Sequence, residues 1–341
     1  MPGTTISRRR HRSHGATPTE PSSRSYGQSK RAVGDVSMSV DSLEGFETVE
    51  RSLREDKHRI DAIKSSLADS RRDPQRLETK RVILPKKPRE LRPASSSIDV
   101  NAAERLIQKL QSNVTSEGEA TLASSLSMRR TRQRVIGALL YALKRHPNSN
   151  LRTFTILNEQ WVFTPQQLNS ITAKRIKNQF RSHLQRAGVL DLPGSFIAFL
   201  HGEFEPTKEV FVIHFHGVTT AEKADALRGL KTQPGYVKSD TGAAPIRIQN
   251  VNDRLSQMTY LLKSYWPQKA VRKCSDGEWR RDRKPSRIPG LFQTQYLLWL
   301  DRQQLGDITI FSGGWSPLND GSPAMRSLYL SIFSRRSDAP E

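Results

Sequence analysis

A short apolar segment with two histidines, Val210–Val218 (VFVIHFHGV), constrains the fold of this chain more than any other feature. Its β-branched and aromatic residues, and the glycine near its end, predict a buried β-strand. Because side chains alternate between the faces of a strand, His214 and His216 share one face and Phe215 lies on the other. Two imidazoles held side by side on a strand form a partial metal site, and two polar residues on a solvated face are the alternative.

The preceding segment, Ser195–Glu205 (SFIAFLHGEFE), predicts the partner strand of an antiparallel hairpin. A symmetric four-residue turn pairs His201 with His214 and places Glu203 on the same face, whereas a shift in register by one residue turns both away. Glu203 is the expected third metal ligand, because a carboxylate neutralises metal charge and binds hard cations, and His201 is the substitute. Glu205 is expected to be a turn residue.

The segments around this hairpin predict an α+β domain between residues 151 and 267. The order β-α-β-β-α-β-α predicts a ferredoxin-like antiparallel sheet with helices packed on one face. A threonine N-cap and a glycine stop mark the first of its helices. Besides the hairpin, the expected elements are strands at 151–157 and 245–251 and helices at 164–188, 221–230 and from 252 or 253 to 266.

Composition separates this domain from its flanking segments. Residues 1–98 are expected to be a basic, mostly disordered arm and linker. Within them, Ser42–Ser70 carries apolar residues at heptad spacing, interrupted by Asp56, and predicts an amphipathic helix that either dimerises weakly or packs on the main domain. Residues 99–150 are expected to be a helical segment and residues 268–341 a basic extension. The elements expected there are helices at 102–110, 128–145 and 291–304 and a strand at 307–311.

The net charge indicates the kind of partner. The chain has 55 Lys and Arg against 34 Asp and Glu, a formal charge of +21, which is the signature of a polyanion and above all of nucleic acid. Solubility alone needs a far smaller charge. The single cysteine, Cys274, excludes an internal disulfide and a cysteine-rich zinc module. No apolar run has the length of a membrane span, so no membrane partner is expected.

Two groups of cations stand out on predicted helices. Arginines at the start of the 128–145 helix oppose its dipole, so we expect them to contact phosphates rather than to stabilise the helix. They are Arg129, Arg130, Arg132 and Arg134. Further basic residues on the 164–188 helix and after residue 267 are expected to hold a DNA backbone. These are Lys174, Arg175, Lys177, Arg181, Arg272 and Lys273.

The predicted helix before Trp266 supplies a candidate nucleophile. On a helical wheel Tyr260 lies opposite the apolar stripe, and Lys263, one turn on, is its neighbour. An ammonium ion beside a phenol favours the phenolate and can stabilise phosphate charge. A tyrosine is more commonly a core or surface residue, and Tyr265, which points into the stripe, is the rival nucleophile.

In this order, the motifs resemble those of rolling-circle replication initiators of the HUH endonuclease superfamily, which also includes conjugative relaxases and some transposases. The resemblance covers residues 151–267: a strand like LRTFTIL, then His214-Phe215-His216, then Tyr260-Leu261-Leu262-Lys263. Glu203 lies where such initiators often place a carboxylate ligand. Because Tyr260 and Tyr265 do not share a helix face, the resemblance is to the single-tyrosine type.

The resemblance implies a site-specific single-strand DNA nickase that initiates rolling-circle replication and rejoins its product. Tyr260 would attack the scissile phosphate to leave a 5′-phosphotyrosine, and Lys263 would offset the charge. A manganese or magnesium ion on the two strand histidines and Glu203, or alternatively His201, would polarise the phosphate. The expected setting is a bacterial cytoplasm, at a plasmid, phage or nucleoid origin, and the absence of a GxxxxGK[ST] loop leaves strand opening and synthesis to host helicase and polymerase.

Two other interpretations remain. A relaxase or single-strand transposase would use the same chemistry, although a relaxase usually has a third histidine after the pair and a tyrosine near its N-terminus. A non-catalytic ferredoxin-like module would bind DNA or RNA through aromatic side chains on its open sheet face, whereas the strand here offers histidines. Trp161 and Trp266 are either base-stacking surfaces or core residues.

Overall fold

The computed structural model describes residues 46–72, 98–113, 120–144, 146–239, 242–263, 265–274, 277, 279–282 and 284–313. The predictions for residues 1–45 and for the linker at 73–97 lie outside these ranges. None of the helices in the described ranges is both long and apolar enough to cross a membrane.

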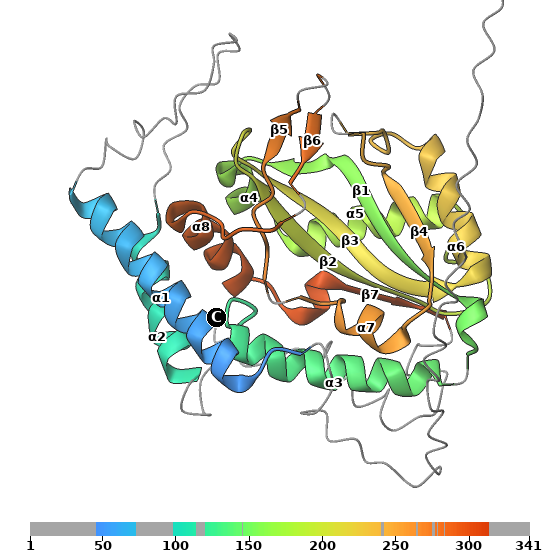
Figure 1. Cartoon of the computed structure of the whole chain (residues 1–341), viewed down its shortest axis with the longest axis horizontal. Helices are drawn as coiled ribbons and strands as arrows, with labels where there is room; N and C mark the ends of the chain where they lie inside the picture. The colour runs from blue at the N-terminus through green and yellow to red at the C-terminus, as the bar shows by residue number, and fades with distance from the viewer. Residues whose placement is uncertain are drawn as a thin grey trace, which may run out of the picture. The chain divides into compact units, whose positions relative to one another are not determined.

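A five-stranded antiparallel sheet organises the domain and confirms the α+β class (Figure 1). From β1 to β4 the chain follows the predicted β-α-β-β-α-β order. The last strand, β7, pairs with β2 and extends the sheet beyond that unit. The strands are β1 (Leu151–Phe163), β2 (Phe196–Glu205), β3 (Val210–Thr220), β4 (Ile246–Asn250) and β7 (Thr309–Ser312), in the order β4-β1-β3-β2-β7.

The β2–β3 hairpin has the predicted register. His201 pairs with His214, and the pairing continues without a shift to the turn. The carboxylate of Glu205 closes this turn by accepting hydrogen bonds from the backbone N–H groups of Thr207, at 2.9 Å, and Lys208, at 2.8 Å. Glu205 is therefore a turn residue, as predicted, and the histidines of both strands face the same side of the sheet.

Two helices replace the single helix predicted between β1 and β2. The first, α4 (Pro165–Ser170), begins with the predicted capping box, in which Thr164 and Gln167 cap each other's backbone N–H groups. The extended backbone of Ile171 ends this helix, and the second, α5 (Ala173–Arg186), begins with its own N-cap, Thr172. The apolar periodicity continues across this break, and for that reason the sequence pattern missed it.

Helix α5 covers the face of the sheet that carries Phe215. Phe180 of α5 stacks on Phe215 with ring centroids 4.4 Å apart. Trp161 of β1 lies edge-on to both rings and is fully buried, so it is a core residue and no stacking surface. Because side chains alternate along β3, this cluster fixes the two histidines on the opposite face. The connection from β3 to β4 consists of α6 (Ala221–Leu227) and a 3₁₀ segment (Arg228–Thr232).

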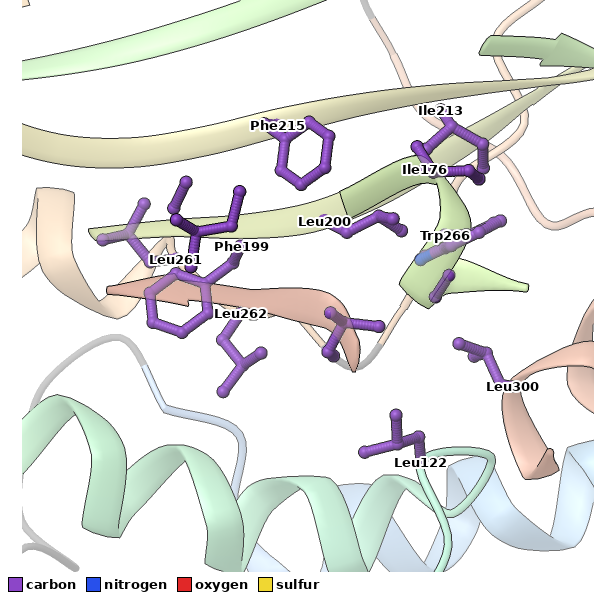
Figure 2. Packing of buried hydrophobic residues seen from close by; sticks show 14 of the residues in the cluster. Leu122, Ile176, Phe199, Leu200, Ile213, Phe215, Leu261, Leu262, Trp266 and Leu300 are labelled. Atoms are coloured by element: carbon purple, nitrogen blue, oxygen red, sulfur yellow. The ribbon is translucent and has the colours of Figure 1, made fainter. Parts of the chain in front are cut away.

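The helix that leads to Tyr260 is much shorter than predicted, which corrects the helical-wheel argument. Helix α7 spans Arg254–Thr259 and Tyr260 is its C-cap. Leu262 follows with a φ of 54°, a left-handed conformation that stops the helix. Leu261 and Leu262 are both buried and lie in the same apolar cluster as Phe199 (Figure 2). The backbone leaves the helical path at this point, and both leucine side chains still reach the core.

The N-terminal helices pack on the domain, which is one of the two arrangements expected for the amphipathic segment. Helix α1 contacts α8, α3 and α2 (Figure 1). The bounds are α1 (Val49–Arg72), α2 (Val100–Ser112), α3 (Ser125–Leu143), a 3₁₀ turn at Asn148–Asn150, α8 (Gly290–Asp301) and a 3₁₀ turn at Leu305–Ile308.

Asp56 docks α1 against the start of α3. Its buried carboxylate accepts hydrogen bonds from the Ser124 hydroxyl at 2.8 Å and from the backbone N–H groups of Ser125 at 2.5 Å and Leu126 at 3.1 Å. A carboxylate at a helix N-terminus satisfies unpaired N–H groups and complements the helix dipole. The residue that interrupts the heptad pattern is thus a polar contact between the two helices.

A two-stranded ribbon, β5 (Val271–Lys273) and β6 (Trp279–Arg281), projects from the basic segment after Pro267. Backbone hydrogen bonds hold the base of this segment beside the end of β2, where the Lys269 N–H donates to the Phe204 carbonyl at 2.9 Å. The sequence predicted only a basic stretch here, because strands of three residues leave no periodic signal.

Replacing Gly202 with alanine is expected to lower the free energy of unfolding by about 1–3 kcal/mol, the usual cost of overpacking a core. A Cβ at this position would overlap the indole ring of Trp266. That ring is itself buried and stacked on Tyr296, with centroids 5.2 Å apart, so it has no room to move. Denaturant unfolding measures the effect. Gly229→Ala is the control, since its Cβ would meet only Ala187 at 3.9 Å, and equal stabilities of the two variants would contradict the packing.

Candidate functional site

Three imidazoles face one another on the β2–β3 hairpin. The ring centroid of His216 lies 4.6 Å from that of His214 and 4.9 Å from that of His201, and the remaining pair is 6.1 Å apart. His201 and His214 are buried, while His216 is partly accessible. The predicted histidine cluster, including the substitute ligand His201, is therefore brought together by the register of the hairpin.

The hydrogen bonds of the two β3 histidines leave their Nε2 atoms turned toward each other, 3.0 Å apart. The Nδ1 of His214 lies 3.3 Å from the Val212 carbonyl, which can only accept, so Nδ1 carries the proton and Nε2 has a lone pair. The Nδ1 of His216 lies 2.8 Å from the Thr155 hydroxyl, which can donate or accept. Rotation of that hydroxyl therefore decides whether the Nε2 of His216 presents a proton or a lone pair.

Burial keeps all three imidazoles neutral at pH 7. It is the largest cause that lowers the pKa of His201 and His216 well below the ordinary value, and nearby positive groups such as Lys263 add to it. The pKa of His214 is also lowered by burial, against the opposing charge of Glu203. The buried Nε2 of His201 has no hydrogen-bond partner within the described chain. These are neutral nitrogens with lone pairs in a confined space.

Glu203 lies on the histidine face as predicted, and both of its carboxylate oxygens have cationic partners. Arg281 donates to Oε1, and the ammonium of Lys269 lies 3.0 Å from Oε2. Burial alone would raise the pKa of this carboxyl, but His214, Arg281 and Lys269 more than reverse that effect and lower it. The side chain is therefore an ionised carboxylate that ties the base of the ribbon to the hairpin.

The donor set fits a metal ion in part. Across the described ranges, no three His, Cys, Asp or Glu side chains form a complete metal-binding group. Two neutral imidazoles with facing Nε2 atoms, and a third with an unpartnered Nε2, are nevertheless donors suited to a borderline transition ion. Since Glu203 is held by two cations, His201 is the freer of the two expected third ligands.

Tyr260 and Lys263 lie next to the histidines. They do so from the end of a short helix and the turn that follows it, and not from one face of the long helix that was predicted. The ring of Tyr260 lies 5.5 Å from the ring of His216, edge to face, and its side chain is 47% exposed. The ammonium of Lys263 lies 3.3 Å above the centroid of the tyrosine ring. Burial, followed by the charges of Lys269 and Arg132, lowers the pKa of Lys263 to about 8.

The alternative nucleophile, Tyr265, has its hydroxyl in a hydrogen bond outside the histidine cluster. The hydroxyl of Tyr265 donates to the Ser286 carbonyl at 2.6 Å. Burial and the neighbouring Tyr296 raise its pKa to about 12, so its phenolate is harder to form than that of an ordinary tyrosine. Trp266, the next residue, is buried and stacked on Tyr296, which makes it a core residue.

Helix α3 holds both ends of the segment that carries Tyr260. At the start of α7, Arg254 donates to the carbonyls of Leu143, at 2.8 Å, and His146, at 2.6 Å. At its end, the buried Arg132 of α3 donates to the Thr259 carbonyl at 2.6 Å, one residue before the tyrosine. These contacts fix the position of the tyrosine backbone relative to the sheet.

The expectation that the α3 arginines contact phosphates is wrong for two of them. Arg129 and Arg132 are buried, and both bind Glu47, the first through its carbonyl at 2.7 Å and the second through its carboxylate. Arg130 and Arg134 remain exposed. The two buried arginines bind protein groups far along the chain, and the expectation of phosphate contacts stays a prediction for the two exposed ones.

A cavity of about 590 Å³ joins the three histidines to the tyrosine. Its wall includes Thr155 from β1, Arg247 from β4, Tyr260 and Lys263 after α7, and Lys269 and Arg281 from the ribbon segment. Four cations and three imidazoles line this wall against a single carboxylate, that of Glu203, so the cavity suits an anion held against neutral nitrogen donors.

The basic residues predicted to bind DNA are only partly near this cavity. Lys174, Arg175 and Arg181 are exposed on α5, which covers the opposite face of the sheet. Lys177 donates to the Gly306 carbonyl at 2.5 Å, and burial lowers its pKa. In contrast, Arg272 and Lys273 are exposed on the ribbon whose base lines the cavity, although Arg272 is paired with Asp282 at 3.1 Å.

The sequence missed three contributions to the site. Thr155 gave no signal beyond its place on a predicted strand, yet it holds His216. Lys269 and Arg281 were only part of a basic stretch, and their pairing with Glu203 depends on how the chain folds back after Pro267. Trp279 is 47% exposed on β6, beside these cations, and is an accessible flat surface.

Comparison with known proteins does not give this chain a family. None of the protein-family models, curated proteins or solved structures compared with it matches. The properties that bear on its function are therefore those of its own residues, above all the adjacency of neutral imidazoles, an accessible tyrosine and several cations.

Stability is expected to fall as the pH drops below about 6.5, the ordinary pKa of histidine. Below this pH the histidines of the unfolded chain bind protons, whereas the buried imidazoles of the folded chain, whose pKa is lowered, stay neutral. Protonation therefore favours the unfolded chain, and the free energy of unfolding decreases until the pH reaches the pKa of the folded state. Each such histidine adds up to about 1.4 kcal/mol per pH unit to the slope. Denaturant unfolding in EDTA across this range should give a shallower slope for His201→Gln. The exposed His58→Gln is the control, and identical slopes for all three proteins would contradict the neutral cluster.

Proposed function

We propose that this chain is a metal-dependent tyrosine endonuclease of the HUH type, which nicks and rejoins single-stranded DNA and so initiates rolling-circle replication. The observation that supports this best is the position of Tyr260. Its half-exposed ring lies 5.5 Å from His216 on the wall of the histidine cavity, with the Lys263 ammonium 3.3 Å above it. A nucleophile, a cation and neutral metal-type donors therefore share one cavity.

In this reaction the phenolic oxygen of Tyr260 forms a bond to the scissile phosphorus, and the bond from phosphorus to the 3′-oxygen breaks. The tyrosine proton is lost and the departing 3′-oxygen takes up a proton, which leaves a free 3′-hydroxyl and a 5′-phosphotyrosine. The 3′-hydroxyl can prime synthesis. Attack by such a hydroxyl on the phosphotyrosine reverses the step and rejoins the strand.

The histidine cluster is proposed to hold the divalent ion, which would polarise a phosphate oxygen when bound. His214 and His216 would offer their Nε2 atoms, with Thr155 accepting the Nδ1 proton of His216. The third ligand would be His201, or Glu203 if its cationic partners give way. Imidazole-rich ligation suits manganese better than magnesium, because magnesium prefers oxygen donors.

Lys263 is proposed to stabilise negative charge on the phosphate and on the phenolate of Tyr260. Its ammonium stands over the ring face and not at a carboxylate, and within the described chain it has no acidic partner. It is therefore available to a substrate anion. Arg247, Lys269 and Arg281 line the same cavity and add positive potential along it.

The ribbon β5–β6 is the proposed support for the strand outside the cavity. Arg272 and Lys273 are exposed there, and Trp279 presents an accessible ring on which a base could stack. The α5 cations face away from the site, so any contact they make with DNA would involve a separate stretch of it.

A non-catalytic nucleic-acid module fits the site less well. Such a module would display aromatic rings on the open face of its sheet. On this face the cavity is lined instead by Thr153, Thr155, Gln249 and the histidines. A relaxase or single-strand transposase would share the chemistry and differ in its substrate.

The decisive experiment incubates the full chain with labelled single-stranded DNA of many sequences, in manganese or in EDTA. Denaturing gels then show any covalent protein–DNA adduct. We expect an adduct that requires the metal and is lost in Tyr260→Phe, by at least about 10³-fold, because the phenolic oxygen is the atom that bonds to phosphorus.

Tyr265→Phe is the matched control, since its hydroxyl is bound to a backbone carbonyl and should not react. An adduct that persists in Tyr260→Phe and disappears in Tyr265→Phe would transfer the role of nucleophile. Binding of DNA without an adduct from any sequence would contradict the enzyme and favour the binding module.

The rate of adduct formation is expected to decline as the pH rises through about 8, because Lys263 then loses its proton and its charge. Lys263→Arg should keep the charge, and with it most of the rate, on the alkaline side, since arginine remains protonated. Single-turnover rates across this pH range measure both. A rate that instead rises with deprotonation in the wild type, and is lost in the arginine variant, would make Lys263 a general base and contradict the electrostatic role.

A further inference from the structure

A second cavity, of about 730 Å³, adjoins the histidine cavity at Tyr260 and Lys263, which line both. Its other walls come largely from parts of the chain outside residues 151–267. Helix α1 contributes Arg51, Arg54 and His58, and helix α3 contributes Arg132. The candidate nucleophile therefore stands between two cavities, one built on the sheet and one built on the N-terminal helices.

Helix α1 presents basic side chains to this cavity. Arg51, Arg54 and His58 stand at positions i, i+3 and i+7, so they share one face of the helix, and all three are exposed. The opposite face is fixed by Asp56, which binds the start of α3, and by Arg59, which donates to the Ala123 carbonyl at 2.7 Å. The buried polar contacts thereby set the rotation of the helix about its axis.

The charges that line this cavity do not cancel. Glu55 is paired with Arg287 at 2.7 Å, and the carboxylate of Glu47 is paired with Arg132. Among the described residues, neither Arg51 nor Arg54 has a carboxylate partner. Two exposed guanidinium groups one turn apart line the same cavity as the ammonium of Lys263, which suits an anion with more than one charge.

We infer that this second cavity holds backbone phosphates of the single-stranded DNA that flanks the scissile phosphate, with Arg51 and Arg54 as the residues that bind them. The inference rests on the proposed function and extends it. A strand whose scissile phosphate lies at Tyr260 has to leave the site in both directions. The histidine cavity and the ribbon would hold the DNA on one side of the scissile phosphate, and the second cavity would hold the DNA on its other side.

The test compares Arg51→Gln/Arg54→Gln with Lys57→Gln/Lys64→Gln, both in full-length protein carrying Tyr260→Phe so that no covalent product forms. Lys57 and Lys64 are exposed on the same helix and line neither cavity, so the control removes the same charge from another face. Fluorescence anisotropy of a labelled oligothymidylate, long enough to cross both cavities, gives Kd as a function of salt. Circular dichroism melts confirm that both variants are folded.

The arginine variant is expected to raise Kd about tenfold at physiological salt and to reduce the slope of log K against log salt by about 1.4, or about 0.7 for each phosphate that is no longer neutralised. The lysine control should change either quantity much less. Equal effects of the two variants would overturn the assignment of the cavity and leave the proposed nickase standing, provided that the wild type forms its adduct. Failure of the Tyr260→Phe protein to bind oligothymidylate would overturn this inference, whereas the nickase is decided by the adduct assay alone. Stronger competition by oligouridylate than by unlabelled DNA would make the occupant RNA.

Discussion

The pairing of His201 with His214 in the β2–β3 hairpin is the constraint on which the site depends. A slip of one residue would turn the β2 side chains to the other face and separate the three imidazoles. The apolar face of β3 prevents this, because Phe215 is held between Phe180 and Trp161. The same packing that stabilises the fold therefore holds three neutral imidazoles together, with two Nε2 atoms 3.0 Å apart and the third without a partner in the described chain, an arrangement that is costly unless a proton or a cation is shared among them.

The sequence predicted those parts of the site that follow from strand periodicity and turn chemistry. The hairpin register, the role of Glu205 and the shared face of the histidines come from a period of two and a symmetric turn, both of which are local. The end of α7 could not be predicted in this way. Leu261 and Leu262 are apolar neighbours that fit a helix as well as the left-handed turn that buries both, and only the surrounding core decides between them.

The partners of the buried polar residues could not be predicted from the sequence, for a different reason. Asp56 was an interruption in an apolar pattern, and Arg132 was one of four cations at a helix start, yet each is buried and hydrogen-bonded to groups far along the chain. Periodicity shows that a polar residue departs from a pattern, but its partner depends on how the helices assemble. Glu203 belongs to the same class, since its two cations come from a segment that returns to the hairpin after Pro267.

The histidines and the tyrosine of the site are therefore held by two different parts of the fold, the sheet and the N-terminal helices. The sheet positions the histidines, whereas Arg132 and Arg254 attach the tyrosine segment to α3, and Asp56 in turn attaches α3 to α1. The distance from Tyr260 to His216 is therefore set by helices that lie outside the stretch in which the motifs occur. Because the same helices carry the arginines of the second cavity, one packing arrangement both orients the tyrosine and aligns the cations that would hold its substrate.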